Sequence, residues 1–225
     1  MPREYCAIRE GTLPVDVFLL HGYKSSTEKI EWLARWFNNL GFNVIRCEYI
    51  GHGKRMKEGD NKQWYSTIEE IEDRIRESEN KVVLAGLSMG GTIAITIGMQ
   101  MEKVAQVFAV SAAYSIPVDP VQVKKLSRMF NEEFTWENTG EIRRAMPLNH
   151  GSCRTSNKNK FFLVHSRNDG IVTFDNLVEN VKMLCLPEEN ILVYDYISGI
   201  GSLDHVLVQY DRRTLDFIER NIVRN

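Results

Sequence analysis

The amino-acid sequence predicts an α/β fold in which a mostly parallel sheet is covered by helices on both faces. Short apolar segments rich in β-branched residues alternate along the chain with segments whose apolar residues recur at helical spacing. One of the predicted strands, Val82–Ala85, runs into Gly86-Leu87-Ser88-Met89-Gly90, and an apolar, helix-compatible run follows at once. A strand, a sharp turn and a helix in this order are typical of α/β enzymes.

The remaining elements follow from the same periodicities. The predicted strands are Val15–Leu20, Asn43–Glu48, Val82–Ala85, Val104–Val110, Phe161–His165 and Ile191–Tyr196. The predicted helices cover residues 30–40 (with Ser26 or Thr27 as N-cap), 66–80, the run after Ser88, about 173–184 and 205–222. In a sheet of this kind, functional residues are expected just past the carboxyl ends of the strands.

Composition narrows the functional classes. The chain has 225 residues, a length compatible with one large domain, and its net charge of -2 gives no electrostatic case for nucleic acid or an anionic membrane. No signal-type apolar region precedes Pro14, and the apolar run Val17–Leu20 is too short to span a bilayer. We therefore expect a soluble, cytoplasmic protein without stable membrane insertion.

The cysteines indicate neither a metal site nor a disulfide framework. Cys6, Cys47, Cys153 and Cys185 are scattered, with no CxxC pair and no histidine-rich spacing beside them. Reduced thiols in a reducing compartment are the prediction. The sequence also has no HExxH motif, and no Lys-Ser/Thr follows Gly51-His52-Gly53, so a zinc hydrolase and a phosphate-binding loop are not indicated.

One segment interrupts the alternation of strands and helices. Residues 115–159 are too long for an ordinary connection and too apolar for a disordered linker. We predict a small helical cap at 115–159 over a core formed by 1–114 and 160–225; the alternative is that the apolar side chains simply cover the core. Those side chains are Val121, Leu126, Met129, Phe130, Phe134, Trp136, Ile142 and Met146.

Ser88 is the predicted nucleophile. A serine on a tight, strained turn holds its hydroxyl above the sheet, and Gly86 and Gly90, which lack a Cβ, allow the strand and the helix to approach closely around it. Gly91 adds further room. The alternative is a glycine-rich turn with an incidental serine, which the flanking strand and helix disfavour.

A serine hydroxyl needs a base and a group that orients the base, expected in the order Ser, acid, His. His205 follows the last predicted strand and is the predicted base, whereas His150 and His165 are in the wrong place or order. Asp169, in the loop after the strand Phe161–His165, is the predicted acid. Its rivals are Asp175, Asp195 and Asp204.

Acyl transfer also needs two donors for the oxyanion. The backbone N–H of Met89, at a helix N-terminus, is one candidate. The backbone N–H of Tyr23 is the other, because Gly22 lets the loop after the first buried strand bend close.

Taken together, these motifs resemble the α/β-hydrolase superfamily along nearly the whole chain, and more narrowly the small bacterial carboxylesterases and monoacylglycerol lipases. The stretches that carry the resemblance are Leu19-Leu20-His21-Gly22, Tyr49-Ile50-Gly51-His52-Gly53, Trp64, Gly86 to Gly91, Asp169 with Ile171-Val172, and Ser202 to Arg213. The resemblance implies Ser88, Asp169 and His205 as the triad, Tyr23 and Met89 as donors, and a small cap. Two departures are the short N-terminus, where antiparallel strands must be reduced or absent, and the long loop 198–204 before His205.

The predicted function is hydrolysis of a small-molecule carboxylic ester with a short to medium acyl chain, monoacylglycerols included, without a cofactor or metal. Aromatic feruloyl-type esters, thioesters and lysophospholipids are alternative substrates, since Phe134 and Trp136 suit an aromatic acyl group. A non-catalytic ligand receptor on the same fold is the alternative outside the enzymes. Neither a monomer nor a homodimer is favoured by the sequence.

Overall fold

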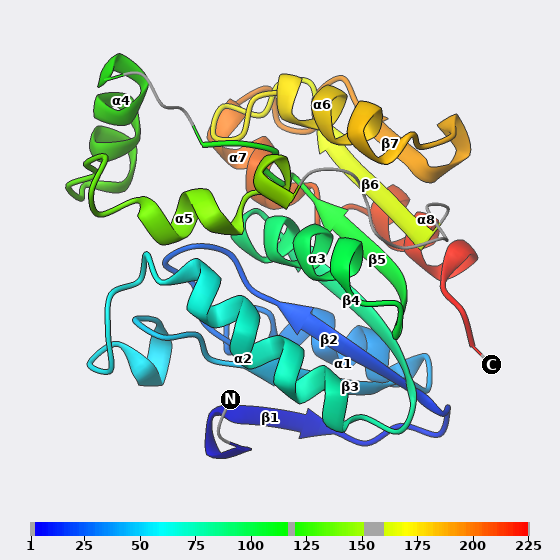
Figure 1. The fold of residues 1–225 in the computed structure, drawn as a ribbon. Helices are drawn as coiled ribbons and strands as arrows, with labels where there is room; N and C mark the ends of the chain where they lie inside the picture. Colours follow the sequence, from blue (N-terminus) through cyan, green and yellow to red (C-terminus); the bar gives the residue numbers. More distant parts are fainter. Residues whose placement is uncertain (1–2, 117–119, 151–159, 225) are drawn as a thin grey trace.

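The computed structural model describes residues 3–116, 120–150 and 160–224. Across these residues seven strands form one sheet in the order β1-β3-β2-β4-β5-β6-β7 (Figure 1). The strands are β1 (Cys6–Arg9), β2 (Val15–Leu20), β3 (Asn43–Cys47), β4 (Lys81–Leu87), β5 (Val104–Val110), β6 (Phe161–Ser166) and β7 (Ile191–Tyr194). Only β1 runs antiparallel to its neighbour among the strand pairs of the described chain, which confirms the predicted mostly parallel sheet.

Helices cover both faces of the sheet, as predicted (Figure 1). Helices α1 and α8 pack with one apolar cluster, and α2, α3 and α6 pack with the other. Burying each large apolar side chain contributes about 1.5–3 kcal/mol. The helices are α1 (Glu31–Asn39), α2 (Trp64–Glu77), α3 (Met89–Gln100), α4 (Pro120–Phe130), α5 (Gly140–Ala145), α6 (Asp175–Leu184), α7 (Gly201–Leu207) and α8 (Arg212–Asn221), with 3-10 turns η1 (Arg3–Tyr5), η2 (Gly53–Arg55), η3 (Pro147–His150) and η5 (Glu188–Asn190).

The central strands bring two loops together. Strand β2 is buried at every position, as expected for a strand covered on both faces, and it pairs with β4 from Val15↔Lys81 to Leu20↔Gly86. Because the two parallel strands end at the same level, the loop that begins at His21 lies beside Ser88. A Cβ built on Gly22 would lie 3.7 Å from the Ser88 Cβ, in ordinary contact.

Several predicted helix boundaries are wrong; α2, for example, ends at Glu77 and not at residue 80. Neither Ser26 nor Thr27 caps α1, because the Thr27 N–H and hydroxyl donate to Glu48 Oε1 at 2.9 and 2.6 Å, and the helix begins later, at Glu31. The closing helix is also divided. His205 lies inside α7, and α8 starts anew where Asp211 accepts the Arg213 N–H at 2.9 Å.

The N-terminal edge corrects the prediction for the cysteines. Strand β1 is a short antiparallel strand whose Cys6 stands directly opposite Cys47 of β3, and the two form a disulfide. Free thiols were therefore the wrong expectation for this pair. Cys185 is free and exposed, and Cys153 lies outside the described residues. The predicted reducing compartment thus loses its support from these two cysteines.

The segment between β5 and β6 carries α4 and α5, and Figure 1 shows both on the side where the parallel strands end. Helix α5 packs against α2 and α3, and Thr96 of α3 donates to the Ala145 carbonyl at 2.8 Å. Residues 117–119 and 151–159 of the predicted cap, and the side chains of Val121 and Leu126, lie outside the description. The cap boundaries therefore stay a prediction, and residues 120–150 are called the β5–β6 segment below. No helix in the described ranges combines the length and apolarity that crossing a bilayer requires.

Candidate active site

Ser88 sits on a strained turn between β4 and α3. Its backbone has φ 54° and ψ -119°, a positive-φ conformation outside the commonly occupied regions that costs a non-glycine residue about 1–3 kcal/mol. The Ser88 N–H donates to Val110 of β5 at 2.8 Å, and its carbonyl accepts the Thr92 N–H at 2.9 Å. The strain is thus held from both sides, by the neighbouring strand and by the first turn of the helix.

The glycines beside Ser88 are required by close backbone approach. A Cβ on Gly86 would lie 2.4 Å from the Gly90 carbonyl carbon, and a Cβ on Gly90 would lie 2.2 Å from the Leu20 carbonyl oxygen. Neither backbone atom can yield as a flexible side chain could. This geometry agrees with the steric reason that the sequence gives for both glycines.

Asp169 and His205 form a buried pair. Asp169 Oδ2 lies 2.8 Å from His205 Nδ1, while Asp169 Oδ1 accepts the N–H groups of Ile171 and Val172, each at 2.9 Å. Burial raises the pKa of Asp169, but the hydrogen bonds from His205 and from the Ile171 N–H outweigh this effect, so the pKa lies below its usual value. The carboxylate is therefore ionised at neutral pH and is placed to orient the imidazole.

His165 is a second histidine beside this pair. It is buried at the end of β6, where its Nε2 lies 2.9 Å from the Val172 carbonyl and 3.7 Å from Asp169 Oδ2. Burial lowers the pKa of His165, so the ring is neutral. Through its hydrogen bond to Val172, His165 holds the loop that carries Asp169. The position of His165 in the sequence did not reveal this role.

In the described chain none of the rival carboxylates has a hydrogen bond or ion pair with His205. Asp175 and Asp195 are exposed, and Asp195 lies 3.4 Å from the Arg167 guanidinium. Asp204 is fully buried and accepts the Ser198 N–H at 2.7 Å, the Ser198 hydroxyl at 2.5 Å and the Ile197 N–H at 3.0 Å. Burial raises the pKa of Asp204, but these hydrogen bonds hold it well below its usual value. Asp204 thus organises the long loop before His205.

The two candidate oxyanion donors and Ser88 line one cavity. Within the described chain, neither the Tyr23 N–H nor the Met89 N–H has a hydrogen-bond partner. Over the same residues, Ser88 Oγ makes no hydrogen bond to His205. Catalytic hydrogen bonds are often long in unliganded enzymes and tighten when the substrate binds.

The cavity has a volume of about 360 Å³, near the lower end for ligand pockets. Its walls are mostly apolar and aromatic and come from the strand ends and from the β5–β6 segment. Trp136 does not line it, because its side chain is 58% exposed and lies against the Arg143 guanidinium. The lining includes Tyr23, Trp64, Ser88, Met89, Ile116, Met129, Phe130, Phe134, Ile142, Met146, Ile171 and Val172.

A buried polar cluster lies behind the Tyr23 loop. The His21 ring stacks on Tyr49 at 3.8 Å, and its Nε2 lies 3.8 Å from Glu48 Oε2. Burial lowers the pKa of His21 to about 3 and also lowers the pKa of His52, so both rings are neutral at pH 7. In the part of the chain that the structure describes, no group of three or more His, Cys, Asp or Glu side chains is placed to hold a metal ion.

The fold and these loops define the class of protein. A parallel sheet with a serine on the strained turn after β4, an aspartate after β6 and a histidine after β7 is the α/β-hydrolase fold. Over residues 15–143 the chain matches the family described as "Serine aminopeptidase, S33", and it belongs to that family of hydrolases.

Individual relatives are more distant. The chain is 25% identical over 107 residues to a thermostable monoacylglycerol lipase of Bacillus sp. (strain H-257), an alignment that covers 46% of this chain and 43% of that protein. It is 29% identical over 86 residues to a carboxylesterase of Bacillus subtilis (strain 168), covering 36% of this chain and 35% of that protein. The matches thus span less than half of each relative.

Solved structures match over almost the entire chain. A lipase-esterase related protein from Clostridium acetobutylicum ATCC 824 superposes with a TM-score of 0.67 at 16% identity, covering 97% of this chain and all of that one (100%). At this identity the likeness shows the fold alone.

Proposed function

We propose that this protein is a serine esterase that cleaves small carboxylic esters through an acyl-enzyme on Ser88. The observation that carries the proposal is the strained Ser88, which lines an apolar cavity together with Tyr23 and Met89, two residues whose backbone N–H groups have no hydrogen-bond partner in the described part of the chain. The family and its esterase and lipase relatives support the same reaction class.

In the proposed reaction His205 Nε2 removes the proton from Ser88 Oγ, which attacks the ester carbonyl carbon. The negative charge moves to the carbonyl oxygen, where the N–H groups of Tyr23 and Met89 stabilise it. His205 then returns the proton to the alcohol as the C–O bond breaks, leaving an acyl-serine. Asp169 holds the imidazole in the required tautomer and stabilises its charged form.

Water completes the cycle by the same proton route. His205 removes a proton from a water molecule, whose oxygen attacks the acyl-serine carbonyl, and the proton passes to Ser88 Oγ as the acid leaves. In this scheme His205 is the base that takes each proton and the acid that passes it on.

The cavity supports short to medium acyl chains, because its volume of about 360 Å³ is modest and its walls are largely apolar. Monoacylglycerols are within the proposed range, as the name of one relative suggests for that protein. The aromatic side chains Tyr23, Phe130 and Phe134 also face the cavity, so a feruloyl-type ester is the second candidate.

The test is a substrate panel run on the wild type beside Ser88→Ala. It holds p-nitrophenyl esters from acetate to palmitate, a monoacylglycerol, a long-chain triglyceride, methyl ferulate, a thioester, a lysophospholipid and an aminoacyl p-nitroanilide. We expect turnover of the short and medium esters that is lost in the variant. Rapid turnover of long-chain triglycerides beside negligible turnover of short esters would contradict the proposed range. A folded wild type that turns over none of these compounds would favour the ligand-receptor alternative.

A further inference from the structure

Tyr23 joins the proposed oxyanion donor to the β5–β6 segment. Its ring lies edge-on to Phe130 with centroids 5.1 Å apart. Its hydroxyl lies 2.9 Å from Glu132 Oε2 and 2.9 Å from Asn61 Oδ1, and its single hydrogen is donated to one of them at a time. Burial, together with the Glu132 hydrogen bond, raises the pKa of Tyr23, so the phenol remains protonated as a donor.

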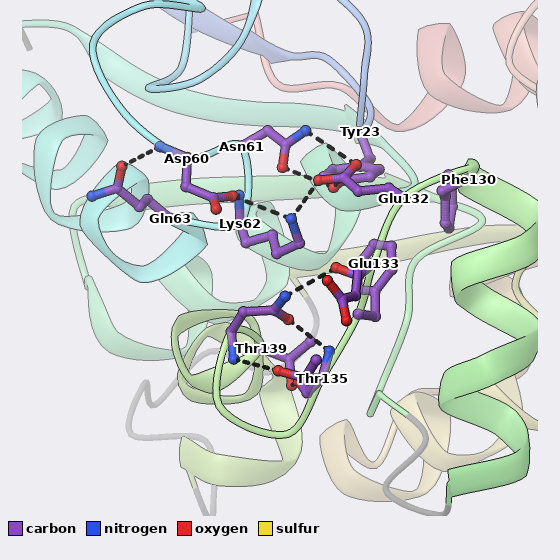
Figure 2. A network of polar contacts seen from close by, with 12 residues as sticks. Tyr23, Asp60, Asn61, Lys62, Gln63, Phe130, Glu132, Glu133, Thr135 and Thr139 are labelled. Atoms are coloured by element: carbon purple, nitrogen blue, oxygen red, sulfur yellow. Dashed lines mark hydrogen bonds and ion pairs between the residues drawn. The ribbon is translucent and has the colours of Figure 1, made fainter.

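Glu132 lies in the loop between α4 and α5, and side chains from two core loops converge on its carboxylate (Figure 2). Lys62 Nζ forms an ion pair with Oε1. Lys24 Nζ lies 2.9 Å from Oε2, and Asn61 Nδ2 donates to Oε2 at 3.3 Å. Two consecutive residues of the loop after β2, Tyr23 and Lys24, are thus held by one carboxylate.

This cluster is largely withdrawn from solvent. The Lys62 side chain is 8% exposed and that of Glu132 is 19% exposed. Burial raises the pKa of Glu132, but the hydrogen bonds from Lys24, Lys62 and Tyr23 lower it to about 2, so the carboxylate is ionised at neutral pH. Removing one charge would leave the other buried without its partner, which is more costly than losing an exposed ion pair.

The Lys24 backbone adds a second constraint on the same loop. Lys24 has φ 52°, a left-handed conformation, directly after the residue whose N–H is the proposed donor. Its Nζ also donates to the Phe130 carbonyl at 2.7 Å, at the end of α4. A strained backbone persists only where its surroundings hold it, and here the β5–β6 segment supplies that hold.

We infer that Glu132 is a positioning residue, which fixes the Tyr23 side chain and the Lys24 side chain and thereby the Tyr23 backbone N–H that receives the oxyanion. This inference rests on the proposed esterase function. Because the oxyanion exists only around the transition state, a displaced donor lowers kcat more than it raises KM. The site is therefore complete only when the β5–β6 segment is seated on the loop after β2.

The experiment compares Glu132→Gln with Glu133→Gln. Both variants remove one negative charge from the same loop, but the exposed Glu133 carboxylate takes part in no ion pair of the described chain, and only the Glu133 carbonyl is bonded, to Asn138 at 2.9 Å. With p-nitrophenyl butyrate we expect kcat to fall about tenfold or more in Glu132→Gln, with KM changed less than about twofold. Glu133→Gln is expected to keep both constants.

A double-mutant cycle tests whether Glu132 acts through the phenol. Tyr23→Phe keeps the ring and the backbone N–H but removes the hydroxyl, so the losses of kcat in Tyr23→Phe and Glu132→Gln are expected to be non-additive. Equal losses in Glu132→Gln and Glu133→Gln, a change confined to KM, or fully additive losses would overturn the inference. If Glu132→Gln does not fold, Lys24→Met replaces it in the same comparison. The Lys24 side chain is 40% exposed, so its substitution disturbs the buried cluster less.

Hydrogen exchange separates this inference from the proposed function. The amides of residues 22–27 are expected to exchange faster in Glu132→Gln than in Glu133→Gln, whatever compound the protein turns over. An inactive wild type with that difference in exchange would contradict the esterase proposal and leave the positioning intact. Equal exchange in the two variants would overturn the positioning role even in an active esterase.

Discussion

At the scale of single residues, the two oxygens of Asp169 have separate tasks. Oδ2 bonds His205, and Oδ1 accepts the backbone N–H groups of Ile171 and Val172. An asparagine can keep the second task through its carbonyl oxygen, but its NH₂ group would face His205 and favour the wrong tautomer.

We therefore expect Asp169→Asn to remain folded and to lose about 10³- to 10⁴-fold in kcat on a short ester. Asp195→Asn is the matched control, since Asp195 is exposed and its only ion-pair partner in the described chain is Arg167. Kinetics and thermal unfolding of both variants check the expectation. A larger loss in the Asp195 variant would move the acid role to that rival.

The sequence allowed Ser88, Asp169 and His205 to be named because each follows a strand, and parallel strands end at one edge of the sheet. The structure brings Asp169 and His205 together, and their catalytic roles stay predictions. Glu132 carried no such signal: its role depends on a loop between α4 and α5 that reaches Tyr23 and Lys62. Trp136 was wrongly expected to suit an acyl group, because amphipathic spacing does not say which aromatic residue faces a cavity.

At the scale of elements, the turn from β4 to α3 depends on Gly90. In a helix interior, replacing glycine by alanine normally stabilises the helix by about 1 kcal/mol. Here a Cβ would lie 2.2 Å from the Leu20 carbonyl oxygen. This clash outweighs the gain in helix propensity, so the substitution is destabilising.

We expect Gly90→Ala to lower the free energy of unfolding by about 2 kcal/mol or more. Gly140→Ala, at the start of α5, is the control, because the nearest atom to its added Cβ is Arg143 Nη2 at 4.0 Å. Urea denaturation of both variants measures the difference. Equal stability of the two would show that β2 and α3 can separate at no cost.

The buried strands were predicted well, whereas the ends of several helices were not. Strands β2 and β5 have the expected bounds, Val15–Leu20 and Val104–Val110. The start of α1 depends on Glu48, a residue distant in sequence that accepts a hydrogen bond from Thr27. The division of the last helix depends on a local cap, Asp211 at the start of α8. The disulfide was missed because Cys6 and Cys47 become neighbours only when β1 pairs antiparallel with β3.

At the scale of the whole molecule, the pH dependence of stability is set in part by buried histidines that are neutral in the folded protein. The pKa of His21 is about 3 in the folded protein against an ordinary value of 6.5. Between these values the unfolded chain binds a proton that the folded chain does not. The stabilisation is therefore complete above pH 6.5 and is lost as the pH falls toward 3.

We expect the free energy of unfolding to fall below pH 6.5, with His21 contributing about 1.4 kcal/mol per pH unit. The pKa values of His52 and His165 are also lowered by burial, so they add to the slope. Urea denaturation of wild type and His21→Gln from neutral pH to about pH 5 measures it. A slope unchanged in His21→Gln would contradict the assignment.

The overall fold was the most predictable feature, because alternating strands and helices with an elbow motif permit few arrangements. Its confirmation rests on the sheet order, the family match over residues 15–143 and the superposed hydrolase structure. The central claim about function is the covalent step on Ser88.

The most direct test of that step is mass spectrometry of the protein after reaction with a fluorophosphonate ester. We expect one adduct per chain, mapped to the peptide that contains Ser88, and no adduct on the folded Ser88→Ala variant. Ester hydrolysis by a protein that forms no adduct, or an adduct retained in Ser88→Ala, would contradict an acyl-enzyme at this residue.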